Sequence, residues 1–120
     1  MGRLQPEFLA RIESFSDRVV HVAAALDRDT VSRRLIDQIL SAGTSVGANV
    51  FEADEAVSRA DFRRALGIAS KELNETRFWL RLIGRHNWLP AARLEGLELE
   101  AHELLRILGT MIVRSKDKTG

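Results

Sequence analysis

The chain has 120 residues, 45% of them hydrophobic, which is the size and composition of one domain with a single core. It has no cysteine, which excludes disulfides, zinc–thiolate sites and cysteine nucleophiles. Its formal charge of +1 is too small for a dedicated nucleic-acid-binding domain. No apolar run reaches the length of a signal peptide or membrane span, so we expect a cytoplasmic, soluble protein with one domain over residues 1–120.

The first predicted helix covers about residues 6–27. Pro6 stands where a helix can begin, because proline lacks the N–H that a first turn leaves unpaired. Apolar residues then recur at alternating intervals of four and three, which is typical of a helix buried along one stripe. They are Phe8, Ile12, Phe15, Val19, Val22 and Leu26.

The second predicted helix covers about residues 30–56, and the side-chain oxygen of Asp29 or Thr30 is expected to cap it. Its apolar stripe includes Asn49, which we interpret as a buried amide that fixes helix register. Beside the stripe lie Gly43 and Gly47, each costing about 1 kcal/mol of helix propensity relative to alanine. Two such glycines indicate close approach of another backbone, either within one subunit or between subunits.

The third predicted helix covers about residues 59–86, and Ser58 with Asp61 resembles a capping box at its start. The fourth covers about residues 90–115 and begins at Pro90. Both repeat the spacing of the first helix. Short connections between long amphipathic helices favour antiparallel neighbours, so the predicted fold is all-α, an antiparallel up-down-up-down four-helix bundle.

The apolar stripe of the third predicted helix is wider than one bundle core needs. Beside its main line lie Ala65, Ile68, Glu72, Glu75, Trp79, Leu82 and His86. A wide apolar stripe on a soluble helix indicates a partner, so we expect a homo-oligomer interface here. Packing within one monomer is the alternative.

Glu72 and Glu75 lie on this stripe, and paired carboxylates occur in catalytic dyads, metal sites and packed interfaces. No nucleophile or glycine-rich loop is near them, and the chain lacks the Glu-x-x-His pairs of di-metal bundles. We therefore interpret both acids as structural and expect no enzyme activity, catalytic residue, cofactor or metal. The expected donors to them are Lys71, Arg77, Asn49 and the Trp79 indole.

A line of basic residues follows the outward side of the same helix. It comprises Arg64, Lys71, Arg77, Arg81 and Arg85, with Arg63 at its edge. Repeated around a ring, this line would form a surface that binds the phosphates of RNA or DNA, with Phe78 and Trp88 available to stack on bases. The alternative is an ordinary solvated face, balanced by the acids of the fourth helix.

Two segments, SAGTSVGANVFEA (41–53) and SRADFRRALGIASKELNETRFWLRLI (58–83), resemble the bacterial four-helix bundle proteins encoded in intervening sequences of large-subunit ribosomal RNA genes. That family includes the accessory protein of diversity-generating retroelements. Ala53 departs from the family pattern, which usually has glycine there. The matching positions are Ser45, Val46, Asn49, Glu52, Lys71, Glu72, Glu75, Thr76, Phe78, Trp79 and Leu80.

The resemblance implies a subunit that assembles into a ring, commonly a pentamer, with no established enzymatic reaction. We expect a homo-oligomeric scaffold or adaptor that binds another protein. The alternative is a nucleic-acid-binding ring like that of the retroelement branch, whose charge excess this sequence lacks. The residues expected at the oligomer interface are Gly43, Gly47, Asn49, Glu52, Glu72, Glu75 and Trp79.

Overall fold

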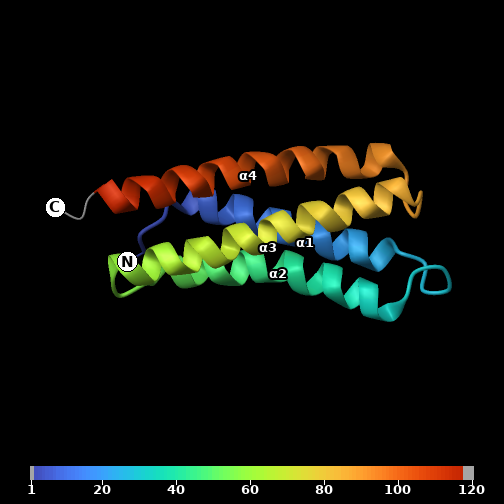
Figure 1. Cartoon of the computed structure of the whole chain (residues 1–120), viewed down its shortest axis with the longest axis horizontal. Coiled ribbons are helices and arrows are strands. Elements are labelled where there is room, and N and C mark those ends of the chain that lie inside the picture. Colours follow the sequence, from blue (N-terminus) through green and yellow to red (C-terminus); the bar gives the residue numbers. More distant parts are fainter. Residues whose placement is uncertain (1, 118–120) are drawn as a thin grey trace.

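The computed structural model describes residues 2–117, which form four helices. These are α1 (Pro6–Ala25), α2 (Arg33–Asp54), α3 (Arg59–Arg85) and α4 (Ala91–Asp117). Successive helices run antiparallel in an elongated bundle of 54 × 22 × 20 Å (Figure 1). The all-α, up-down-up-down four-helix bundle predicted from the sequence is confirmed. No helix in this described part is long and apolar enough to cross a membrane.

The stripes predicted from the sequence form the core. Phe15 of α1, Ile39 of α2, Leu73 of α3 and Leu104 of α4 are all at most 1% exposed. Residues at the outer ends of the stripes, such as Phe8, are only half-buried, because fewer helices cover them there. The four-and-three spacing therefore predicted which side of each helix faces inward.

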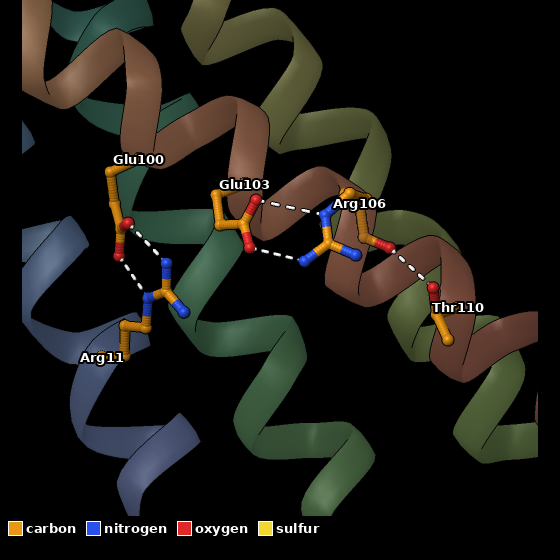
Figure 2. A network of polar contacts seen from close by, with 5 residues as sticks. All are labelled: Arg11, Glu100, Glu103, Arg106 and Thr110. Atoms are coloured by element: carbon orange, nitrogen blue, oxygen red, sulfur yellow. Dashed lines mark hydrogen bonds and ion pairs between the residues drawn. The ribbon is translucent and has the colours of Figure 1, made fainter.

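Among the helix pairs that contact one another, α1 and α4 have the least extensive contact, and a bidentate ion pair crosses it. Arg11 Nε and Nη2 donate to the two Glu100 carboxylate oxygens at 2.7 and 2.8 Å (Figure 2). Next to it on α4, Arg106 donates to both oxygens of Glu103 at 3.1 and 2.6 Å. The hydrogen bond to Glu100 raises the pKa of Arg11, and the one from Arg106 lowers the pKa of Glu103.

The predicted cap of α2 was wrong, because this helix begins after Ser32 and not after Asp29 or Thr30. The Ser32 hydroxyl accepts the Leu35 N–H at 3.2 Å. The upstream residues instead form a turn around Asp27, whose carboxylate accepts the Asp29 N–H at 2.9 Å and the Thr30 hydroxyl at 3.1 Å. Several residues with capping side chains stand close together here, and turn formation decides which one is used.

The start of α3 agrees with the prediction, because the Ser58 hydroxyl accepts the Asp61 N–H at 3.1 Å. After α3 the chain turns through Asn87, whose φ of 57° lies in the left-handed region that asparagine tolerates. The Trp88 N–H then donates to the Ile83 carbonyl at 3.1 Å. This turn reverses the chain into α4.

The segment before α1 is hydrogen-bonded to the C-terminal end of α2. The Leu4 N–H donates to the Asp54 carboxylate at 2.7 Å, and the Arg3 N–H donates to the Asp54 carbonyl at 3.0 Å. Arg3 Nε also donates to the Ala56 carbonyl at 2.9 Å. Asp54 is 9% exposed, so this buried carboxylate has a clear structural function.

Candidate functional site

Polar and apolar side chains selected in the sequence analysis lie together along the edge between α2 and α3. Asn49 and Glu52 of α2 line a hollow of about 420 Å³ with Ile68 of α3. Helical spacing then places the later members of the set on the same face of α3 as Ile68. We call this set the acidic flank: Asn49, Glu52, Ile68, Glu72, Glu75 and Trp79.

Within the acidic flank, Glu75 is a hydrogen-bond acceptor for Trp79. The Trp79 indole N–H donates to Glu75 Oε2 at 3.2 Å, and its ring packs against the core. This bond confirms one of the donors predicted for the acids. The Glu72 side chain is half-buried and has no hydrogen-bond or ion-pair partner within residues 2–117. Glu75 therefore helps to hold Trp79 in place within one chain, whereas the Glu72 carboxylate can still accept a hydrogen bond from another subunit.

Asn49 differs from its predicted environment. It is half-buried and not fully buried, and its side-chain N–H donates to the Ser45 carbonyl one turn earlier at 2.9 Å. The amide therefore bonds within α2 and makes no hydrogen bond to Glu72 or Glu75. The Asn49 side chain also lines the hollow between α2 and α3.

The two glycines of α2 face α1 of the same chain. A Cβ atom at Gly43 would overlap the Val19 side chain, and one at Gly47 would lie 2.9 Å from Ser16 Oγ. The Ser16 hydroxyl also donates to the Gly43 carbonyl at 3.3 Å. The predicted close approach of another backbone is therefore explained inside one subunit.

The cations predicted on the outward side of α3 are mostly exposed. Arg64, Lys71, Arg81 and Arg85 lie on the surface together with Phe78, which is 51% exposed. We call these five residues the basic stripe. The Arg85 guanidinium lies 5.9 Å from the centre of the Phe78 ring, a cation–π contact.

Two further arginines are at the margin of the basic stripe. Arg77 is half-buried, and Arg63 donates to the carbonyl and hydroxyl of Ser115 on α4 at 3.4 Å. Arg63 therefore helps to hold α3 against α4. Arg77 lies about four turns further along the same side of α3.

The described residues contain no group of three or more His, Cys, Asp or Glu side chains that could hold a metal ion. The acidic flank and the basic stripe are adjacent on α3: Arg64 lines the same hollow as Ile68, and the Phe78 and Trp79 rings are 5.2 Å apart. The flank can bind another surface through apolar contacts and hydrogen bonds, and the neighbouring stripe can bind one through positive charge.

Residues 7–110 match the family model described as 23S rRNA-intervening sequence protein. Among solved structures, the chain is similar to a protein of unknown function from the S23 ribosomal protein family of Bacteroides thetaiotaomicron VPI-5482. The two share 36% identity over 87% of this chain and 96% of that chain, with a TM-score of 0.81. No curated protein matches the chain. The family match spans all four helices, and the chain belongs to the 23S rRNA-intervening sequence protein family.

Proposed function

We propose that the chain is a non-enzymatic subunit of a homo-oligomeric, ring-like scaffold that assembles through the acidic flank. The family resemblance favours five copies. One observation carries the proposal: the flank combines an exposed apolar side chain, Ile68, with the partnerless half-buried carboxylate of Glu72.

A second copy of the chain could bury the exposed part of Ile68 and supply a hydrogen-bond partner for Glu72. Ile68 is 40% exposed on the face that also carries the half-buried Trp79, so a partner surface would remove further apolar area from water. A half-buried carboxylate gains stability from a donor, and a neighbouring subunit can supply one to Glu72. An oligomer interface therefore accounts for the composition of this face better than a solvated surface does.

Sedimentation equilibrium of Ile68→Glu tests this proposal. The substitution places a charge on the flank at a side chain that one subunit leaves 40% exposed, so the helices should remain folded. We expect the assembly to dissociate into smaller species. Leu99→Glu on α4 is the matched control, because Leu99 is 65% exposed and lies away from the flank, and it should keep the wild-type mass. If both variants keep that mass, the flank is not the interface.

A second candidate function is binding of RNA or DNA through the basic stripe. On α3, the exposed positions 64, 67, 71, 74, 78, 81 and 85 include four cations and one aromatic residue but no acid. Five copies in a ring would concentrate this charge although each chain is almost neutral. Phosphate contacts of this kind are independent of sequence and weaken steeply as salt increases.

A mobility-shift assay at low salt tests the second candidate. We expect weak binding to single- or double-stranded RNA or DNA, which the double substitution Arg81→Glu and Arg85→Glu should abolish. Arg33→Glu with Arg34→Glu makes the same charge change at exposed positions of α2 and should have a smaller effect. If the wild-type protein gives no shift with any of these nucleic acids, the basic stripe is an ordinary solvated surface.

A further inference from the structure

The groove between α1 and α4 contains a cluster of basic side chains that belongs neither to the acidic flank nor to the basic stripe. Arg18 and His21 of α1 and Arg93 of α4 line a hollow of about 160 Å³ there. In the part of the chain that the structure describes, none of these three side chains has a hydrogen bond, an ion pair or a ring contact, and no carboxylate lines the hollow. The two guanidinium charges are therefore not balanced locally.

A balanced pair lies one heptad away in the same groove. Arg11 of α1 and Glu100 of α4 form the bidentate ion pair between these helices (Figure 2). Because α1 and α4 run antiparallel, seven residues forward on α1 and seven residues back on α4 lead to Arg18 and Arg93. A cation thus stands where the acid of the first pair would be repeated, and the like charges repel each other.

Two local features favour an anion in this hollow. Arg18 Nη2 lies 3.3 Å from the position that a Cβ atom would take at Gly96, so this guanidinium lies directly against α4. Arg93 belongs to the first turn of α4, which has no acid, and the positive end of the helix dipole disfavours a cation there. An anion between Arg18 and Arg93 would reduce their mutual repulsion and would interact favourably with the same end of the helix dipole.

The shape and donors of the hollow indicate the kind of anion. Two guanidinium groups can bind the oxygens of a phosphate group, whose charge is roughly −1.5 to −2 at neutral pH, and the His21 imidazole can donate a further hydrogen bond. The remaining lining residues, Val22 and Leu97, are at most 5% exposed and offer little apolar surface to an organic group. We propose that the hollow binds a phosphate group, either as inorganic phosphate or as the phosphate of a monoester whose organic part lies in solvent.

NMR of protein labelled with ¹⁵N-arginine tests the proposal at constant ionic strength, with inorganic phosphate, glycerol 3-phosphate and glycerol as probes. We expect both phosphate compounds to shift the Nε–Hε signals of Arg18 and Arg93 to saturation, and glycerol to leave them unchanged. Equal affinities would identify inorganic phosphate as a sufficient ligand, and tighter binding of the ester would identify a monoester. Absence of a saturable shift with both phosphate compounds, or equal shifts of all exposed arginines, would overturn the proposal.

Variants at exposed positions locate the site without disturbing the core. Arg18→Gln and Arg93→Gln should each weaken phosphate binding by about tenfold, because each removes a charge-assisted hydrogen bond. Arg93→Glu places an acid opposite Arg18, as Glu100 lies opposite Arg11, and should abolish binding. Arg64→Gln is the matched control, since it removes the same charge from the basic stripe on α3. Wild-type affinity in both glutamine variants of the groove, or an equal loss in Arg64→Gln, would contradict the assignment.

Discussion

Gly43 lies where α1 and α2 approach too closely for a larger side chain. In Gly43→Ala, the new methyl group would overlap Val19, and overpacking of this kind costs about 1 to 3 kcal/mol. The gain of about 1 kcal/mol in helix propensity offsets only part of this cost. We therefore expect a lower free energy of unfolding, measured by urea denaturation.

Gly67→Ala is the control for this prediction. Gly67 also lies inside a helix, but a Cβ atom there would meet no atom within 4 Å beyond its chain neighbours and the adjacent backbone of its own helix. This variant should be more stable than the wild type by up to about 1 kcal/mol. Equal stabilisation by both substitutions would show that the contact between Gly43 and Val19 is not tight.

Single residues were predictable where the signal in the sequence is local. Ser58 and Asp61 stand three residues apart, so their hydrogen bond was predictable. The function of Asp54 was not predicted, because its partner Leu4 is 50 residues away along the chain. One signal was available: an acid at the negative end of the α2 dipole is unfavourable unless a tertiary contact stabilises it.

At the scale of the element, α4 carries a pair whose effect depends on pH. The hydrogen bond from Arg106 holds the pKa of Glu103 below its ordinary value of 4.5. A carboxyl whose pKa is lowered by folding stabilises the protein above its unfolded-state pKa, and this contribution disappears as pH falls through the folded-state pKa. The Glu103–Arg106 pair therefore contributes at neutral pH and not in strong acid.

Arg106→Gln should raise the pKa of Glu103 towards its ordinary value. Titration of the Glu103 carboxyl carbon by NMR measures this shift directly. Arg93→Gln removes a charge from the same helix near its start and should leave the titration of Glu103 unchanged. An unaltered pKa in Arg106→Gln would mean that the hydrogen bonds shown in Figure 2 are not maintained in solution.

The helices themselves were predictable because their apolar residues repeat along the chain, so a single pattern indicates both the helix and its buried side. It was harder to predict which neighbouring helix each residue beside the apolar stripe would face. Gly43 and Asn49 lie six residues apart on α2, yet the first faces Val19 of α1 and the second borders the hollow between α2 and α3. Only the packing of three helices distinguishes these two environments.

At the scale of the whole molecule, Trp79 should be the most sensitive position of the acidic flank. Truncation of a large aromatic side chain in a core costs about 3 to 5 kcal/mol, and in Trp79→Ala part of this loss should appear as dissociation of the assembly. Glu72→Gln should be milder, because it keeps the shape and hydrogen-bonding capacity while removing the charge. Sedimentation velocity, with circular dichroism to verify folding, measures both effects.

Trp88→Ala is the control for Trp79→Ala. Trp88 is also half-buried and packs against the core, but it lies in the turn after α3 and stacks on His86. It should lower stability without changing the mass of the assembly. A folded Trp79→Ala protein of wild-type mass would show that the flank is not between subunits, and Glu72 would need another explanation.

The group of arginines at one end of the bundle has no counterpart in the sequence patterns. Arg3, Arg59 and Arg114 are distributed over almost the whole chain, and only the antiparallel topology brings them to one end of the bundle. A pattern confined to one helix, like the basic stripe, is visible in a sequence. A cluster drawn from three elements is not.

The mass of the protein in solution tests whether the chain assembles with copies of itself. Sedimentation equilibrium of the unmodified protein over a range of concentrations should give a multiple of the 13.5 kDa of one chain, with about five times that mass for the favoured ring. A mass of 13.5 kDa at every concentration would contradict the proposed assembly.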